Sequence, residues 1–239
     1  MLFRVGIENN DEGYRSIAWA LEHPGCFAYG SSADLALDEL LEAIQEYASW
    51  IGRHEASWIE AEEPELIVEQ TFEAYDISPD FDRVESGTYT VNSFFQYDWK
   101  PLSEADLGHA LKLLAWEHSD LLELLHALTP EQWGYRAKGE RWDITGIVRH
   151  IGGANWWYLD RLGRAFPSAE LPEVTLQRLE KVDACLASAL PSLVGVRQVV
   201  GVDGELWSPR KLVRRAAWHM RDHTQHIRKL LQAQPGPGS

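Results

Sequence analysis

Three histidines lie close together near the end of the chain, in the segment WHMRDHTQHI that covers residues 218–227. His219, His223 and His226 are separated by four and then three positions, so that all three fall on one face of an α-helix. Two imidazoles four residues apart on a helix can bind the same metal ion, as they do in helical zinc sites. The spacing therefore predicts either a metal-binding face or a row of histidines that are solvated or internally hydrogen-bonded.

A metal ion needs at least a third ligand, and the segment VRHIGGANWW offers His150. Gly152 and Gly153 follow it and weaken a helix by about 1 kcal/mol each relative to alanine, which indicates close packing or a site. Three neutral imidazoles leave one position of a tetrahedral ion open, the arrangement of a catalytic zinc site. Such an ion lowers the pKa of a bound water toward about 7 or holds a thiol as a thiolate.

The elements that must position these histidines are helices. Apolar residues recur every three or four positions in four segments, which predicts helices over residues 102–128, 142–166, 173–193 and 208–233. Ser103 with Asp106 predicts a capping box, and Ser208 with Pro209 predicts the start of the last helix. An Asp-Gly pair in VRQVVGVDGELW predicts a short hairpin before that helix. Four such helices predict an all-α bundle, in which His118 and His126 are solvated or hydrogen-bonded side chains.

The segments RHI and WHMRDHTQHIRKLL together resemble the DinB-like (damage-inducible) family of four-helix metalloproteins, over roughly residues 103–232. The resemblance implies a divalent metal, zinc or nickel, bound by His150, His219 and His223. Many relatives have two adjacent histidines in the second helix, where this chain has Arg149 before His150. The expected second-shell or pocket residues are His226, Asp222, Gln225, Trp156 and Trp157, with one of the two tryptophans lining the pocket near His150.

Some DinB-like proteins are transferases or isomerases that activate a low-molecular-weight thiol such as bacillithiol or mycothiol. The resemblance therefore implies a metal-dependent thiol transferase or related enzyme, with such a thiol and a small-molecule substrate as its partners. A second interpretation stays open, in which the protein is a noncatalytic, metal-stabilised interaction protein or an antitoxin-like protein.

The first hundred residues have a different pattern. A hairpin is predicted for the segments LFRVGIE and GYRSIAWALE, and a break in the chain for PGCFAYGSS. Residues 32–51 have the pattern of an amphipathic helix capped by Ser32. Further strands are predicted for ELIVEQTFEAY and GTYTVNSFFQYD. We expect a small antiparallel sheet packed on one helix. The segment EHPGCFAYGSS resembles the HicB-like antitoxin domain, which implies a β-β-α-β module that often dimerises and in antitoxins masks a toxin ribonuclease. No DNA-binding motif accompanies it, so we expect a regulatory or dimerising role and a homodimer.

Composition sets the fold class and the compartment. The 239 residues predict an α+β protein of two domains, 1–100 and 101–232, with a disordered tail over 233–239. Residues 1–100 hold 5 basic against 21 acidic side chains, a balance that repels phosphate and argues against nucleic-acid binding. The chain has no apolar run of 18 residues and no signal segment, and Cys26 and Cys185 are far apart, so we expect a cytoplasmic protein without a membrane span.

Overall fold

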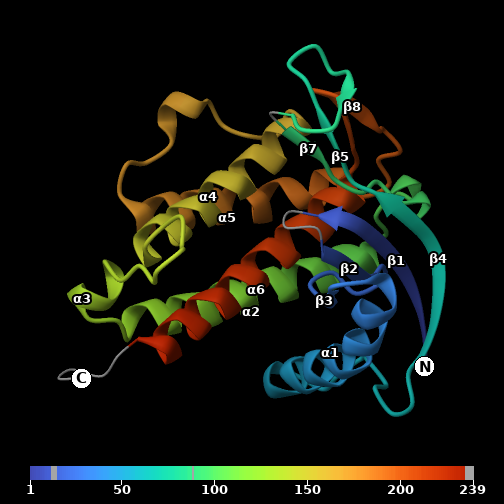
Figure 1. Ribbon diagram of the computed structural model, residues 1–239, viewed down its shortest axis with the longest axis horizontal. Coiled ribbons are helices and arrows are strands. Elements are labelled where there is room, and N and C mark those ends of the chain that lie inside the picture. Colours follow the sequence, from blue (N-terminus) through green and yellow to red (C-terminus); the bar gives the residue numbers. More distant parts are fainter. Residues whose placement is uncertain (12–14, 88, 235–239) are drawn as a thin grey trace. The chain divides into compact units, whose positions relative to one another are not determined.

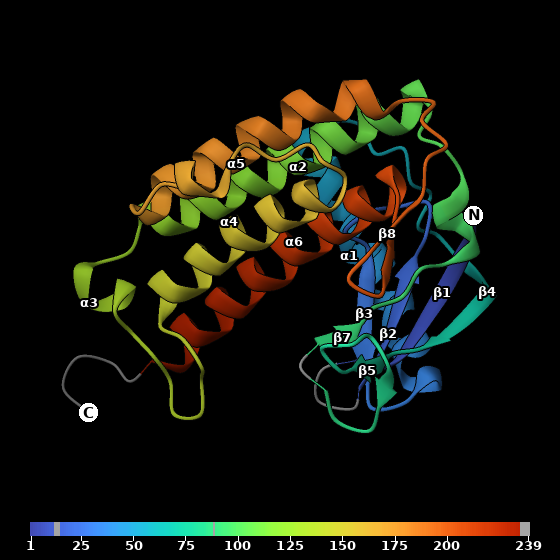
Figure 2. The same cartoon turned by 90° about the horizontal axis from the view of Figure 1, so that it is seen from above.

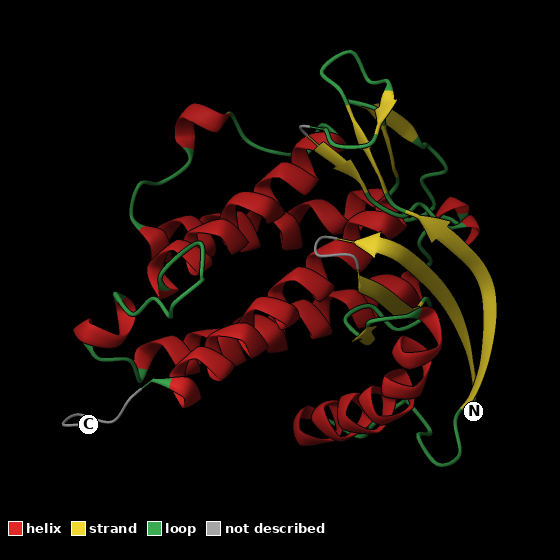
Figure 3. Cartoon of the chain, viewed as in Figure 1, coloured by secondary structure: helices red, strands yellow, loops and turns green. Residues whose placement is uncertain are grey.

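The computed structural model describes residues 1–11, 15–87 and 89–234. Within these residues the chain contains both long helices and several small sheets, which confirms the α+β class (Figure 1, Figure 3). It divides into two compact units, the first formed by Met1–Pro101 and Arg197–Arg214, the second by Leu102–Val196 and Arg215–Ser239. The first boundary lies next to the one expected at residue 100, whereas the return of residues 197–214 to the first unit was not expected.

The main sheet of the first unit has the strand order β3-β2-β1-β4. Its strands are β1 (Leu2–Asp11), β2 (Arg15–Ala20), β3 (Phe27–Gly30) and β4 (Glu65–Glu73). The predicted pairing of β1 with β2 is antiparallel, as expected for a hairpin, although the turn at residues 12–14 is outside the described part. The expectation of an antiparallel sheet is wrong for β4, which pairs parallel to β1. The reason is the helix between β3 and β4, which carries the chain back so that the next strand runs in the same direction.

The helix of the first unit is α1 (Ala33–His54), and it begins where the sequence predicts. The Ser32 side chain accepts a hydrogen bond from the Leu35 N–H, as an N-cap does. Its buried stripe packs on β1, β2 and β3, while Leu41 is 36% exposed. The segment PGCFAYGSS is also more than a break, because Phe27 to Gly30 pair with β2 as an edge strand.

Two smaller sheets complete the first unit. One has the order β6-β5-β7, formed by β5 (Tyr75–Ile77), β6 (Arg83–Val84) and β7 (Tyr89–Val91), and is followed by the 3-10 helix η1 (Gln96–Trp99). The other is the hairpin of β8 (Val200–Val202) and β9 (Glu205–Trp207), as predicted. Asp203 and Gly204 at its turn have φ angles of +50° and +78°, the left-handed conformations that a two-residue type I′ turn requires.

Buried ionic contacts explain why residues 197–214 belong to the first unit rather than to the helical part. The Lys211 ammonium donates to the carboxylate of Glu205, which also accepts from the Tyr89 hydroxyl. The Arg214 guanidinium lies 2.7 Å from an Asp98 carboxylate oxygen, and both side chains are almost fully buried. Because a buried charge is stable only with its partner, the contacts of Glu205 with Tyr89 and of Arg214 with Asp98 hold the segment in the first unit.

The second unit is helical. It contains α2 (Glu104–His126), the short α3 (Pro130–Trp133), α4 (Ile144–Arg161), η2 (Ser168–Glu170), α5 (Thr175–Ala189), η3 (Leu190–Leu193) and most of α6 (Pro209–Ala233). In Figures 1 and 2 the helices α2, α4, α5 and α6 run alongside one another. The predicted capping box of Ser103 and Asp106 is confirmed, and the Ser208 hydroxyl accepts from the Lys211 N–H at 3.2 Å. Helix α6 extends to Ala233, so the disordered tail predicted for residues 233–239 is wrong at its first residue. Residues 235–239 lie outside the described part.

The four long helices of the second unit share one hydrophobic core. Its buried side chains come from all of them: Leu121, Leu125, Ile144, Ile147, Val148, Ile151, Leu179, Met220, Ile227 and Leu230. A Cβ atom added to Gly152 would lie 3.2 Å from the Arg178 Cγ atom and 3.4 Å from the Leu179 backbone, so Gly152 packs directly against α5, whereas Gly153 has no such neighbour. None of the helices in the described ranges combines the length and the hydropathy that crossing a bilayer requires.

Candidate metal centre

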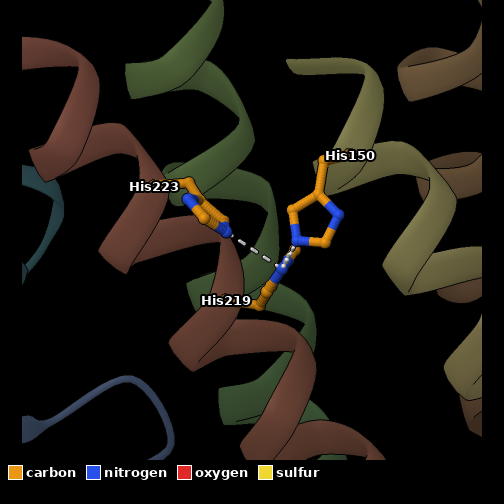
Figure 4. A group of neighbouring side chains, drawn as sticks. All are labelled: His150, His219 and His223. Carbon is orange, nitrogen blue, oxygen red and sulfur yellow. Dashed lines mark hydrogen bonds between the residues drawn. The ribbon is translucent and has the colours of Figure 1, made fainter. Parts of the chain in front are cut away.

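Helices α4 and α6 bring three of the predicted residues to one point (Figure 4). His219 and His223 lie one turn apart on α6, and His150 lies on α4. The Nε2 atom of His219 is 3.0 Å from the Nε2 atom of His150 and 3.1 Å from that of His223. The ligand atoms of all three side chains lie within 4.8 Å of one another. Residues separated by 69 positions in the chain thus form one cluster of imidazole nitrogens.

The local sequence accounts for this placement. Asp143 is the N-cap residue of helix α4, and its carboxylate accepts a hydrogen bond from the Gly146 N–H at 2.7 Å. Ile147 and Ile151 then face the hydrophobic core, and His150, between them, stays half-buried at the edge of that core. On α6, Met220 is in the core while the preceding residue, His219, is buried on the adjoining face. The apolar periodicity of both helices therefore sets the direction of the imidazoles.

The geometry of the cluster fits a divalent cation. Zinc–nitrogen bonds are about 2.0–2.1 Å long, so two nitrogens bound to one tetrahedral ion are about 3.3 Å apart. The His219 Nε2 atom lies at nearly this separation, 3.0 Å and 3.1 Å, from those of His150 and His223. His219 is 3% exposed, and its pKa is lowered well below 6.5 by burial and by the neighbouring His223, His150 and Arg215. Its imidazole is therefore neutral at pH 7 and has a nitrogen lone pair available for a metal.

Aromatic side chains pack around the cluster. The Trp142 ring stacks on the His150 ring at 4.7 Å between centroids and an angle of 30°. The rings of Tyr158 and Trp218 lie 5.9 Å and 5.7 Å from the His219 ring. Neither Trp142 nor Tyr158 was predicted to lie next to the histidines. Tyr158 follows His150 by eight positions, about two helical turns, so helical spacing could have identified it.

Trp156 and Trp157, one of which was predicted to line the pocket near His150, contact Phe166 and Arg161. The Trp156 indole N–H donates to the Phe166 carbonyl at 2.9 Å. The Trp157 ring lies under the Arg161 guanidinium at 4.7 Å. Both contacts lie toward the C-terminal end of α4, while the indole that stacks on His150 is that of Trp142.

The other predicted second-shell residues are all on α6. His226 has its ring 6.2 Å from the His223 ring, and its Nε2 atom lies 3.2 Å from a carboxylate oxygen of Glu140. Asp222 and Gln225 are half-buried. At about 100° per residue, Gln225 lies on a different side of α6 from His223.

A separate group of polar side chains occupies the second unit. Glu117 is 3% exposed, and burial raises the pKa of its carboxyl well above 4.5. Neither of its oxygens has a hydrogen-bond partner among the described residues. Next to it in sequence, His118 contacts the Asp183 carboxylate through Nδ1 at 2.5 Å, which raises its pKa. His118 is thus hydrogen-bonded, as predicted, and the cluster of His150, His219 and His223 is the one group in the described residues arranged to hold a metal.

Comparisons of the chain with protein-family models, with curated proteins and with solved structures find no match. The resemblances to the DinB-like and HicB-like families therefore stay predictions from short motifs. Fold and site together define an α+β protein in which two helices present three converging imidazoles.

Proposed function

We propose that the second unit binds one divalent cation, zinc or nickel, through the Nε2 atoms of His150, His219 and His223. The observation that supports this most directly is the convergence of the three nitrogens around His219, at 3.0 Å and 3.1 Å. Imidazole donors suit zinc and nickel among the common divalent metals. Because His219 is buried and neutral, its Nε2 atom can bind a metal at pH 7 in the tautomer that carries the proton on Nδ1.

We further propose that the protein is a metal-dependent thiol transferase or related enzyme of the DinB-like type. A divalent cation held by three protein ligands supplies Lewis-acid chemistry to a water molecule or thiol at its open position. The residues of the chain orient the site: Trp142 holds the His150 ring by stacking, and Tyr158 and Trp218 flank His219. In this proposal the four long helices form the bundle that carries the site, and the first unit is a HicB-like module that dimerises a cytoplasmic protein.

The burial of His219 also supports a second function, in which the cation joins α4 to α6 and only stabilises the fold. A structural metal ion contributes directly to folding, so its removal unfolds the protein, whereas an open catalytic site can lose its metal with little unfolding. Thermal unfolding with and without a chelator therefore distinguishes the two functions.

Metal content is the first test. Protein purified without a histidine tag is analysed by elemental mass spectrometry as wild type, His150→Ala and His219→Ala. The matched control is His126→Ala, an exposed histidine on α2. We expect near-stoichiometric zinc or nickel in the wild type and the control, and its loss in the other two variants. A wild-type protein that is empty and also takes up no added zinc or nickel would overturn the proposal.

A further inference from the structure

The loop that joins α3 to α4 contacts both helices that carry the candidate ligands. The Trp142 ring stacks on the His150 ring of α4, with 4.7 Å between the centroids. Two residues earlier in the chain, a Glu140 carboxylate oxygen lies 3.2 Å from the Nε2 atom of His226 on α6. The His226 ring lies in turn 6.2 Å from the ring of His223. The loop therefore spans from α4 to α6 beside two of the three candidate ligands.

A glycine in the first turn of α4 makes room for the Trp142 side chain. Gly146 lies four residues after Trp142 and about one helical turn before His150. A Cβ atom added to Gly146 would lie 2.8 Å from the Trp142 Cβ atom, well inside the distance of about 3.5–4.0 Å at which carbon atoms pack. Because this position has no side chain, the indole can lie back along α4 against the His150 ring.

Residues 138–142 are held mainly by these side-chain contacts. In the described part of the chain, their one backbone hydrogen bond runs from the Glu140 N–H to the Ala137 carbonyl, at 3.1 Å. Gly139 has a φ angle of +94°, and an added Cβ atom would meet nothing within 4 Å. A glycine in open space changes its backbone angles at little steric cost. The segment can therefore leave the helices when the contacts of Trp142 and Glu140 break.

Exchange at a buried site requires the residues around it to move. His219, the central nitrogen donor of the cluster, is 3% exposed. We propose that residues 138–142 form a strap whose detachment from His150 and His226 sets the rate at which a divalent cation enters and leaves the three-histidine site. This inference rests on the proposed metal centre and adds to it a device that controls exchange.

A gate and an orienting contact differ in what they change. A gate alters the rates of uptake and release together and leaves their ratio, the dissociation constant, unchanged. A residue that only orients His150 for the metal would instead change the dissociation constant. Both rates must therefore be measured.

Metal exchange tests the strap directly. Uptake of Co²⁺ by the metal-free protein, and its removal by excess EDTA, are followed by stopped-flow visible absorption, which reports coordination of this ion. Trp142→Ala should accelerate both by about two- to twelvefold, as expected for the loss of a stacked aromatic pair, with an unchanged dissociation constant. Glu140→Gln should accelerate both less, by at most about fivefold, because its contact with His226 is partly exposed.

Further variants separate the strap from general effects of substitution. Gly146→Ala keeps the tryptophan but displaces it, so it should accelerate uptake and release as Trp142→Ala does, and it provides a second test if Trp142→Ala does not fold. Trp157→Ala removes another half-buried tryptophan close to α4's C-terminal end, and Glu123→Gln removes an exposed glutamate of α2. Both controls should keep the wild-type rates.

Three results would contradict the strap. Unchanged uptake and release in both Trp142→Ala and Gly146→Ala would overturn it and leave the metal centre in place. Faster release with unchanged uptake, and hence a weaker dissociation constant, would also overturn it, because Trp142 would then only orient His150. A wild-type protein that takes up no Co²⁺ would overturn the metal centre and this inference with it.

Discussion

Helix α6 carries two groups of buried titratable side chains, and the two groups differ in the charged side chains that surround them. In the first unit, Lys211 contacts Glu205 and Arg214 contacts Asp98, so each positive charge has a carboxylate partner. In the second unit, the pKa of His219 is lowered by burial and by its neighbours His223, His150 and Arg215, which are imidazoles and a guanidinium.

The difference separates structural from binding residues. The ion pairs of the first unit are complete within the chain, since Glu205 also accepts from Tyr89 and Asp98 from the Phe95 N–H. The histidine cluster has nitrogen lone pairs that converge on one point, and a cation would complete it. Removal of a residue should therefore lower stability in the first group and ligand binding in the second.

The largest expected effect is on the stability of the first unit. Arg214→Met leaves the Asp98 carboxylate buried without its guanidinium, which should lower the free energy of unfolding by about 3–5 kcal/mol. Urea denaturation of the full chain measures it. The double variant Arg214→Met/Asp98→Asn removes both charges and should recover much of the loss. A single variant as stable as the wild type would contradict the structural role of the pair.

The next effect depends on metal. Zinc present at 100 times its dissociation constant should stabilise the wild type by about 2.7 kcal/mol. His219→Ala should show no such increase, because it removes the nitrogen that contacts both other imidazoles. Thermal unfolding with and without zinc measures the difference, and equal zinc-dependent shifts in both proteins would show that the cluster does not bind the ion.

Glu117 offers a pH-dependent comparison, because it is buried without a charged partner in hydrogen-bond contact. Its pKa is raised in the folded state, so the folded protein keeps a proton that the unfolded chain loses above about pH 4.5, and stability falls as the pH rises from there toward the folded pKa. A rise of one unit in the folded-state pKa changes the free energy of unfolding by about 1.4 kcal/mol.

Glu117→Gln cannot ionise, so we expect it to be more stable than the wild type at pH 8 and equally stable near pH 4. Chemical denaturation at the two pH values measures this effect. A variant that is less stable at pH 8 would show that the Glu117 carboxylate is ionised and paired in the folded protein.

The smallest expected effect concerns His226. Its ion pair with Glu140 is one-third exposed on both sides, and such pairs contribute about 0–1 kcal/mol. His226→Gln should therefore change the free energy of unfolding by less than about 1 kcal/mol and should leave zinc affinity within the error of a competition assay. A large loss of zinc affinity would instead place His226 among the ligands.

Much of the helical architecture could be predicted from sequence because it depends on local interactions. Ser32, Ser103 and Ser208 cap helices where the residue types indicate, and the Asp203-Gly204 turn forms the predicted hairpin. The direction of β4 could not be predicted, because the sequence does not show how α1 returns the chain to the sheet.

The candidate site also has one part that local sequence predicts and one part that it does not. The stripe of His219, His223 and His226 follows from helical periodicity, which depends only on positions along one helix. The packing of α4 against α6 brings His150 to His219 and places Trp142 and Tyr158 around them. Buried ionic contacts decide that residues 197–214 belong to the first unit. The sequence by itself determined which side chains could bind a metal and on which helix face they lie. The tertiary structure decided which of them meet, because contacts between distant segments depend on core packing and on the pairing of buried charges, which no local pattern encodes.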